Sequence, residues 1–236
     1  MGLPDDILAA IHNTDHPHDR PFVTLSYAQS LDGSLAANRG ERTQISGSES
    51  ARLTHFLRAN HDAILIGIGT LLIDNPQLTV RLVEGENPRP VVLDSKLQTP
   101  TDSLLVRSNP PWIATIKSSD DMYAHQLTSK GVKLFTLPAN DQGRVSLPDL
   151  MNVLHGEGIN SIMVEGGTRV ITGFLLAKLV DYLVLTISPQ ILGGVPSVQF
   201  DRWQNNNDLR KKGIKLGNYS IGKAGIDLVV FGRLEW

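Results

Sequence analysis

A short apolar run that ends in a carboxylate, two glycines and a hydroxyl residue constrains the fold of this chain most. The run covers residues 161–164, and Glu165-Gly166-Gly167-Thr168 follows it. The amphipathic segment 169–179 comes next, so the pattern predicts a strand, a tight turn and a helix. Glycine lets a ligand approach the backbone, and the positive end of a helix favours an anion such as phosphate. We therefore expect an anion-binding turn, with Glu165 placed to hold hydroxyl or amino groups of a nucleotide-like molecule.

Strand-like and helix-like segments alternate along most of the chain. Strands are predicted at 22–27, 62–66, 90–93, 112–116, 132–136, 161–164, 182–187 and 226–234. Helices are predicted at 46–60, 119–130, 146–155 and 169–179. The first of these helices is expected to begin with a capping box, in which Ser46 is the cap and Glu49 stands three residues later. This alternation predicts an α/β domain with a mainly parallel sheet.

The two most polar segments are expected to lie outside the core. Residues 1–20 contain His12, His16 and His18, which fit a polar N-terminal arm better than a metal site. Residues 201–223 fit a solvated loop better than a cofactor contact, although they include basic residues. We find no internal repeat and no low-complexity linker, so we expect one domain over residues 21–236.

Charge and hydropathy exclude several classes of partner. The formal net charge of −2 gives no global basic field, so nucleic-acid binding is not expected as the main function. The apolar runs are too short to span a bilayer, so no membrane association is expected either. Residues 1–20 lack the apolar core of a signal peptide, and we expect a cytoplasmic protein.

The chain contains no cysteine, which excludes disulfides, thiolate nucleophiles and a zinc nucleobase-deaminase site. It also lacks the Gly-x-Ser-x-Gly motif of a hydrolase nucleophile and the full Gly-x-x-x-x-Gly-Lys-Ser/Thr motif of a P-loop. No metal-binding set is expected. Hydride transfer by a bound cofactor is therefore favoured, because the cofactor then carries the chemistry.

The run Gly67-Ile68-Gly69-Thr70 follows an apolar strand but does not complete a dinucleotide fingerprint, because Leu72 occupies the third glycine position. A glycine-rich loop near a ligand is the better interpretation. Arg58 and Arg81 could together grip a phosphate, since guanidinium groups bind it bidentately. From the residues alone, two solvated surface arginines are the more common outcome. His55 and His61 are interpreted as surface or satisfied core histidines.

Residues 21–195 contain an ordered series of motifs. The series is Pro21 to Gly33, Leu57 to Leu65, Gly67-x-Gly69-Thr70-x-x-x-Asp74-Asn75-Pro76-x-Leu78, Asn87-Pro88-Arg89-Pro90, Leu93-Asp94-Ser95, Met163 to Gly167, and Pro189-x-x-Leu192-Gly193-Gly194. As a set, it resembles the riboflavin-biosynthesis reductases, which use NADPH to reduce the ribosyl group of an aminopyrimidine ribose 5′-phosphate to ribityl. In many bacteria this reductase is the C-terminal domain of a bifunctional deaminase-reductase.

The resemblance implies a dihydrofolate-reductase-like three-layer α/β fold, with a central mostly parallel sheet, helices on both faces and a homodimeric assembly. Without room or cysteines for a deaminase, the chain resembles the stand-alone reductases of fungi and archaea. Thr43-x-Ile45-Ser46 and Asp74-Asn75-Pro76 favour the fungal type. Stand-alone members act on the pyrimidine before its deamination, but the residues themselves leave the aminated or deaminated substrate open.

The resemblance also assigns roles to individual residues. The NADPH-binding residues are expected to be Ala28, Thr70, Asp74, Ser95, Gly166, Gly167 and Thr168. The substrate-binding residues are expected to be Arg58, Leu78, Arg81 and Glu165. Asp74 and Glu165 are the expected catalytic residues. One departure is the sequence Arg42-Thr43-Gln44, which replaces the Ser-Gln-Trp run of bacterial members and leaves the contacts of that loop open.

The expected reaction opens the ribose ring at C1′ to an imine, to which NADPH delivers hydride. The proton could come from Asp74, Glu165 or water, and the sequence does not choose among them. Two alternatives stay open: another pterin- or pyrimidine-directed NADPH reductase of the same fold, and a nucleotide-binding regulatory module without turnover. The preference for NADPH over NADH, the hydride face and the dimer surface are not determined by the sequence.

Overall fold

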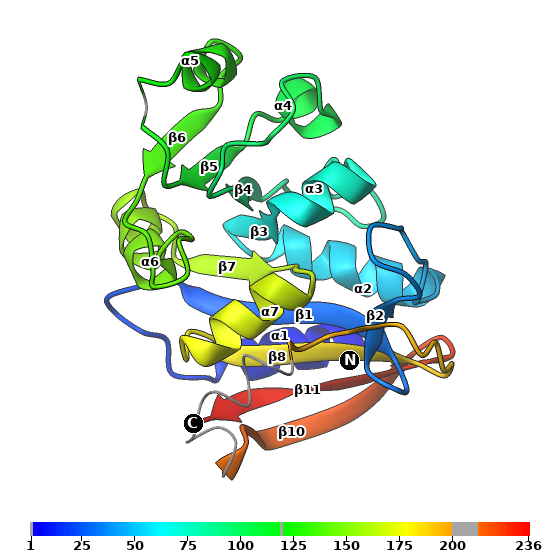
Figure 1. The fold of residues 1–236 in the computed structure, drawn as a ribbon. Coiled ribbons are helices and arrows are strands. Elements are labelled where there is room, and N and C mark those ends of the chain that lie inside the picture. The colour runs from blue at the N-terminus through cyan, green and yellow to red at the C-terminus, as the bar shows by residue number, and fades with distance from the viewer. Residues whose placement is uncertain (1, 119, 200–211) are drawn as a thin grey trace.

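The computed structural model describes residues 2–118, 120–199 and 212–236 (Figure 1). Its strands are β1 (Phe22–Ser30), β2 (Ser34–Ala36), β3 (Ala63–Gly67), β4 (Arg89–Leu93), β5 (Trp112–Thr115), β6 (Lys133–Thr136), β7 (Ser161–Val164), β8 (Tyr182–Ser188), β9 (Val195–Pro196), β10 (Lys215–Ala224) and β11 (Asp227–Glu235). Its helices are α1 (Leu3–His12), α2 (Ser48–Ala59), α3 (Ile68–Asp74), α4 (Leu104–Ser108), α5 (Met122–Thr128), α6 (Leu147–Gly156) and α7 (Thr168–Leu176).

A sheet of nine strands forms the centre of the molecule, in the order β10-β11-β8-β1-β7-β3-β4-β5-β6. The strands from β8 to β6 in this order are all parallel to one another. Strand β11 is antiparallel to β8, and β10 is antiparallel to β11. The short strands β2 and β9 form a separate antiparallel pair. The expectation of a mostly parallel sheet is confirmed.

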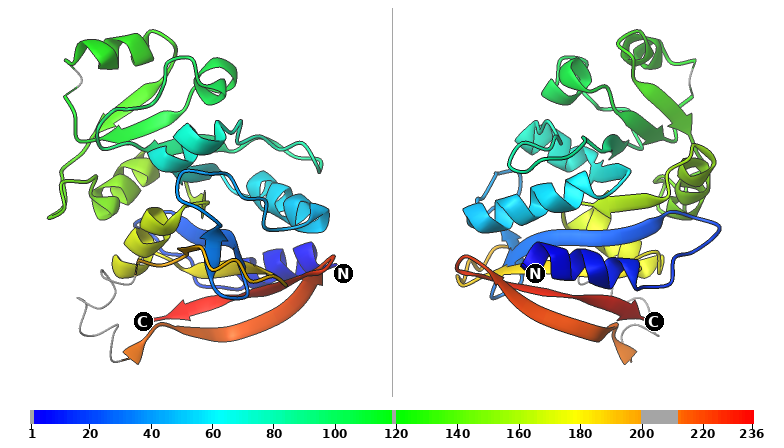
Figure 2. Two further views of the ribbon diagram at one scale, coloured as in Figure 1. Left: turned by 45° about the vertical axis from the view of Figure 1, so that its right-hand side comes forward. Right: turned by 180° about the vertical axis from the view of Figure 1, so that it is seen from behind.

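Helices cover both faces of this sheet, as expected. In β3, Ala63 and Leu65 belong to the cluster of buried side chains that includes residues of α6 and α7. The alternate residues Ile64 and Ile66 belong to the cluster on the opposite face, with residues of α3, α4 and α5. The same face carries α1 and α2 over β1, β8 and β11, which is visible from behind in Figure 2. A strand buried on both faces needs apolar side chains at successive positions, which explains the unbroken apolar run of β3.

The N-terminal segment 1–20 contributes a packed helix. Ile7 and Ile11 of α1 are buried against the sheet with residues of α2. Arg20 then forms a bidentate ion pair with Asp181, with both N···O distances at 2.7 Å. The segment is therefore polar in composition but connected to the core through two aliphatic side chains and one ion pair.

The expected capping box at Ser46 is wrong, because α2 begins one residue later than predicted, with Gly47 as its N-cap. The carboxylate that binds the start of the helix is Asp227, which is distant in sequence, and not the expected Glu49. The Gly47 N–H donates to Asp227 Oδ2 at 2.8 Å, and the Ser50 hydroxyl donates to the same oxygen at 2.6 Å. Asp227 is fully buried at the start of β11, so a tertiary contact determines where this helix begins.

The solvated loop expected at 201–223 is wrong for its last part. Residues 200–211 lie outside the described residues, whereas Lys215–Ala224 forms strand β10. Most side chains of β10 are exposed, so the segment reads as polar. Its backbone is nevertheless paired with β11 along nearly the whole strand, and it forms one edge of the sheet.

Candidate functional site

The order of the strands places the topological switch point of the sheet at the carboxyl ends of β7 and β3, the position where open α/β sheets form a ligand-binding crevice. The chain leaves β7 through α7 toward β8, whereas it leaves the neighbouring β3 through α3 toward β4. In open α/β sheets, ligands bind where adjacent connections diverge in this way. The Glu165 N–H donates to the Leu65 carbonyl at 2.9 Å. The turn that the sequence predicted as the anion-binding site therefore begins at this crevice, next to the end of β3.

Glycines on the two sides of the crevice have two different functions. A Cβ at Gly67 would lie 2.8 Å from Val170, and one at Gly166 would lie 2.5 Å from the same side chain. These two glycines therefore let α7 pack closely against the end of β3. At Gly69 and Gly167, a Cβ would meet no heavy atom within 4 Å. The backbone there is open to a ligand, and Gly167 is the N-cap of α7.

The hydroxyl of Thr168 has a structural partner, since it donates to the Pro196 carbonyl at 2.6 Å. This bond connects the first turn of α7 to strand β9. The predicted cofactor role of Thr168 is not tested by this contact, because a hydroxyl that donates one hydrogen bond can still accept another.

The most strongly connected pair of predicted residues is Arg58 and Glu165. Arg58 Nε and Nη2 donate to the two carboxylate oxygens of Glu165, each at 2.7 Å. The side chains are 12% and 20% exposed. Burial opposes the charge of Arg58, but the neighbouring carboxylate outweighs it and raises the pKa of the guanidinium. Arg58 lies in the last turn of α2 and Glu165 follows β7, so this pair joins two elements 107 residues apart in sequence.

Arg58 also reaches the extended segment 75–81, which we call the strap. Its Nη1 donates to the Thr79 carbonyl at 3.3 Å. Leu78 in the strap is 2% exposed and has a positive φ of 54°, a conformation that a branched side chain adopts only where its surroundings hold it. The predicted substrate-binding residues Arg58, Leu78, Arg81 and Glu165 thus lie on elements in direct contact.

The side chain of Arg81 is exposed at the end of the strap. Its Nη1 donates to the Thr79 hydroxyl at 2.6 Å and to the Gln77 amide oxygen at 3.3 Å. Within the described part of the chain, no carboxylate lies within ion-pair distance of it. Arg81 is therefore a cation available to an anionic ligand, whereas Arg58 is largely occupied by Glu165.

The remaining predicted cofactor residues lie along the same carboxyl edge. Thr70 and Asp74 are one turn apart on α3. Burial raises the pKa of Asp74, and the positive charge of Arg42 opposes this shift. Ser95 follows β4, where its hydroxyl oxygen accepts the Val145 N–H at 3.1 Å. Ala28 lies near the end of β1. The strands β1, β7, β3 and β4 are consecutive in the sheet, so all these residues belong to one edge.

Two residues near the site had no assigned role in the sequence analysis. Arg42 belongs to the loop whose contacts were left open, and its charge reaches Asp74. His55 was interpreted as a surface or satisfied core residue, but its Nδ1 accepts the Arg81 N–H at 2.9 Å. The spacing of His55 and Arg58 indicates that both lie on one face of a helix, but it does not identify Arg81 as the partner.

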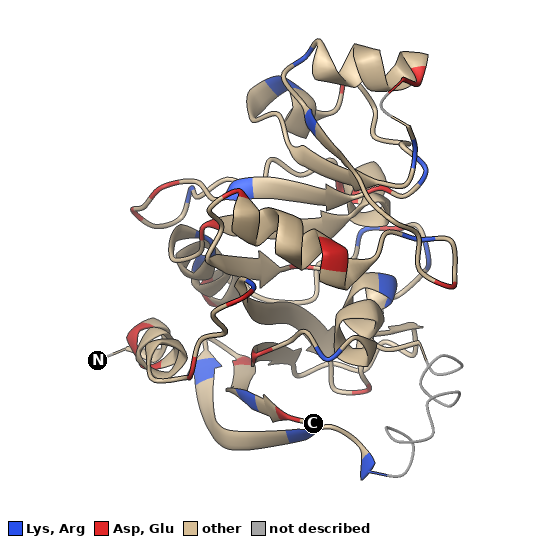
Figure 3. Cartoon of the chain, turned by 90° about the vertical axis from the view of Figure 1, so that its left-hand side faces the viewer, with Lys and Arg blue, Asp and Glu red and all other residues tan. Residues whose placement is uncertain are grey.

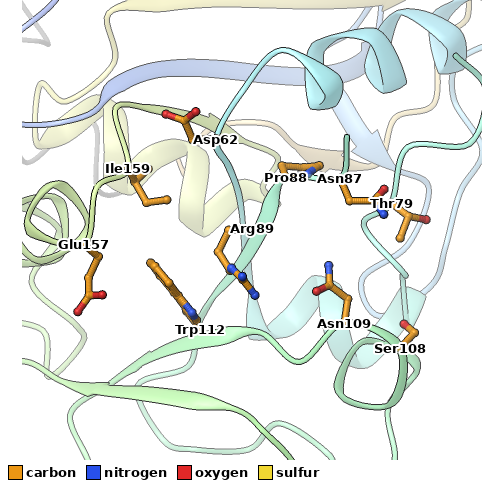
Figure 4. A pocket seen from close by; sticks show the side chains of 10 residues that line it. All are labelled: Asp62, Thr79, Asn87, Pro88, Arg89, Ser108, Asn109, Trp112, Glu157 and Ile159. Atoms are coloured by element: carbon orange, nitrogen blue, oxygen red, sulfur yellow. The ribbon is translucent and has the colours of Figure 1, made fainter. Parts of the chain in front are cut away.

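A cavity lies at the opposite edge of the sheet, at the amino ends of β4 and β5. It has a volume of about 570 Å³ and is lined by Asp62, Thr79, Asn87, Pro88, Arg89, Ser108, Asn109, Trp112, Glu157 and Ile159 (Figure 4). None of the predicted site residues lines it. Two of its lining residues connect it to the strap, since Thr79 belongs to the strap and Asn87 Oδ1 accepts the Val80 N–H at 2.7 Å.

The described residues contain no group of three or more His, Asp and Glu side chains that could hold a metal ion. Over that same part of the chain, no helix has the length and apolar character required to cross a bilayer. On the face drawn in Figure 3, basic and acidic residues are interspersed.

Comparison with known proteins gives a consistent result. Residues 21–219 match the model of the RibD C-terminal domain family. The chain is 38% identical over 196 residues to the 2,5-diamino-6-ribosylamino-4(3H)-pyrimidinone 5′-phosphate reductase of Debaryomyces hansenii, covering 74% of this chain and 77% of that protein. It is 32% identical to the reductase of the same name from Candida glabrata, over 93% of this chain and 92% of that one. The solved riboflavin biosynthesis reductase of Saccharomyces cerevisiae superposes with a TM-score of 0.76 at 30% identity, over 99% of both chains.

Proposed function

Because the chain belongs to the RibD C-terminal domain family, we propose that it is the NADPH-dependent reductase of riboflavin biosynthesis. The substrate is a (di)aminopyrimidine ribose 5′-phosphate, whose ribosyl group becomes ribityl through reduction at C1′. The observation that carries the proposal is the Arg58–Glu165 pair at the carboxyl edge, beside the exposed cation of Arg81.

The carboxyl edge suits NADPH on physical grounds. Gly69 and Gly167 leave open space where a side chain would otherwise block approach to the backbone. The N-terminus of α7 favours a pyrophosphate, because its first N–H groups and its dipole attract negative charge. NADPH bound there would supply the hydride. The residues proposed to hold it are Ala28, Thr70, Asp74, Ser95, Gly166, Gly167 and Thr168.

The strap and the Arg58–Glu165 pair suit the substrate. We assign the substrate phosphate primarily to Arg81, whose guanidinium has only neutral partners among the residues that the structure describes. Arg58 orients the Glu165 carboxylate, which then holds hydroxyl or amino groups of the substrate. Leu78 provides an apolar contact beside them. Holding the two reactants in a fixed orientation accounts for a large share of the rate enhancement in such enzymes.

Asp74 is the better candidate for delivering the proton. Burial raises its pKa, so that a larger fraction of the carboxyl group is protonated near neutral pH than at an exposed aspartate. Glu165 is already committed as the acceptor of two charged hydrogen bonds from Arg58. Glu165 therefore orients the substrate, and Asp74 or a water next to it protonates the product.

The proposal extends to the whole protein. Residues 21–236 would form a single reductase domain, with α1 from the N-terminal segment packed onto it. A cytoplasmic homodimer is proposed from the family resemblance. No nucleic acid or membrane is required for the reaction.

One assay tests the proposed function. Purified protein is mixed with NADPH and either the diaminopyrimidine ribose 5′-phosphate or its deaminated counterpart, and absorbance at 340 nm is followed. Oxidation that depends on the pyrimidine supports the reductase, and the faster substrate identifies the order of deamination and reduction. Binding of both compounds without oxidation would support a regulatory module. Oxidation with a pterin lacking ribose phosphate would support a different reductase of the same fold.

A further inference from the structure

Helix α2 holds the strap through two side chains on one face. Arg58 donates to the Thr79 carbonyl, and His55, one turn earlier, accepts the Arg81 N–H through Nδ1. The helix therefore offers the strap a donor and an acceptor, as a neighbouring strand would. His55 is 5% exposed, so this backbone N–H is satisfied by a side chain in a largely enclosed position.

We propose that His55 is a positioning residue, which fixes the strap so that the Arg81 guanidinium meets the substrate phosphate, and that it acts only as the neutral imidazole. The inference rests on the proposed function. The geometry requires an unprotonated Nδ1, because this nitrogen accepts a hydrogen bond from a backbone donor. The ring proton is then on Nε2.

The surroundings of His55 favour the same neutral form. Burial lowers its pKa most, and the positive charges of Arg58 on α2 and Arg81 on the strap lower it further. The carboxylate of Glu165, which follows β7, acts in the opposite direction. These are the charged groups that face His55. Protonation would remove the acceptor for the Arg81 N–H and would place a third positive charge beside the two arginines.

His61 provides a matched control near the end of the same helix. It is also buried, and burial lowers its pKa as well. Its Nδ1 and Nε2 contact the Leu57 carbonyl at 2.7 Å and the Thr24 hydroxyl at 2.8 Å. Those partners belong to α2 and β1, so His61 stabilises the core without touching the strap.

The experiment compares three variants of the full-length chain. In His55→Leu the acceptor is lost, whereas in His55→Asn the side-chain oxygen can occupy nearly the position of Nδ1. His61→Asn controls for the loss of a buried histidine. We expect His55→Leu to raise the KM for the pyrimidine phosphate about tenfold, because an unsatisfied buried N–H is costly, while the KM for NADPH and kcat change much less. His55→Asn should retain most of the affinity, and His61→Asn should lower the melting temperature with both KM values unchanged.

The pH profile separates positioning from a purely structural role. Because the pKa of folded His55 lies below the ordinary histidine value near 6.5, the wild-type KM for the phosphate substrate should rise only at a pH lower than that value, where His55 becomes protonated. The rise that remains in His55→Asn measures the titration of the substrate phosphate itself. Equal profiles in these two proteins would contradict the requirement for a neutral imidazole. Equal losses in kcat and in both KM values in His55→Leu would contradict positioning.

A readout that does not depend on activity distinguishes failure of this inference from failure of the proposed function. NMR spectra of the wild type should show the Nε2–H tautomer of His55, and the Arg81 amide should exchange slowly with solvent. In His55→Leu the Arg81 amide should exchange faster, while amides of the core strands stay protected. If the Arg81 amide exchanges faster in His55→Leu but neither protein reduces the substrate, the proposed function is wrong, whereas the role of His55 in fixing the strap is supported. An Arg81 amide that exchanges equally in both proteins would overturn the inference.

Discussion

The two edges of the central sheet differ in how their charged groups are used. At the carboxyl edge, Arg58 and Glu165 pair across the crevice, and Arg81 next to them has no acidic partner among the described residues. At the amino edge, the Asp62 carboxylate accepts the N–H groups of residues 160 and 161. The Arg89 guanidinium there lies 5.4 Å from the centre of the Trp112 ring.

The amino-edge cavity is not the better candidate site. The amino edge has a cavity of about 570 Å³, and its Asp62 carboxylate fixes the start of β7 by accepting the N–H groups of residues 160 and 161. Among the described residues, Arg89 in this cavity has no acidic partner, and neither has Arg81. The carboxyl edge differs in its two glycines with open backbone and in a carboxyl group with a raised pKa. A carboxyl group with a perturbed pKa and open backbone at the carboxyl ends of strands locate chemistry more reliably than the volume of a cavity.

The largest expected effect comes from Glu165→Gln. The amide keeps the shape of the side chain but loses the charge that pairs with Arg58, so the substrate-facing group is no longer held in place. We expect kcat to fall on the order of a hundredfold, as when one oriented polar group is removed from an active site. The Kd for NADPH, measured by fluorescence titration, should change little. Unchanged turnover would remove Glu165 from the site.

The second largest effect is expected when one arginine is replaced at each edge of the sheet and the kinetics of the two variants are compared. Arg81→Met keeps most of the side-chain length but removes the charge, and we expect the KM for the phosphate substrate to rise roughly ten- to a hundredfold, the value of a charged hydrogen bond. The matched variant Arg89→Met removes a charge from the amino-edge cavity and should change kcat/KM by no more than about twofold. Steady-state kinetics of both variants checks this. A larger loss in Arg89→Met would place the phosphate at the amino edge.

The smallest effect is on stability. Burial lowers the pKa of His55 and of His61 below the ordinary value near 6.5. The unfolded chain therefore takes up protons before the folded chain does, and the free energy of unfolding should fall as the pH drops below about 6.5. Urea denaturation at about pH 7.5 and about pH 5.5 measures this loss. The double variant His55→Asn, His61→Asn should lose less stability over the same interval, and an equal loss would assign the pH dependence to other groups.

The sequence predicts the strands of the core well, because each needs a run of apolar residues on a short segment. It fails at β10, where the side chains are mostly exposed and only backbone pairing with β11 makes a strand. It also fails at the start of α2, because the acceptor for the Gly47 N–H is Asp227, 180 residues away. Local patterns contain no information about such partners.

The residues of the candidate site also divide into those that a local sequence pattern identifies and those that depend on a partner distant in sequence. Glu165 and the two glycines after it could be identified locally, since a strand, a turn and a helix lie within one stretch of sequence. The ion pair with Arg58 could not, because it joins residues 107 apart. The bond from Arg81 to His55 was missed for a similar reason, and buried histidines have many structural uses.

A crystal structure with NADP⁺ tests the central claim most directly, namely that the reactants meet at the carboxyl edge between β7 and β3. We predict density for the pyrophosphate beside Gly167 at the N-terminus of α7, with the nicotinamide ring directed toward the Arg58–Glu165 pair. Density for the dinucleotide in the cavity lined by Asn87, Arg89 and Trp112 would contradict the account.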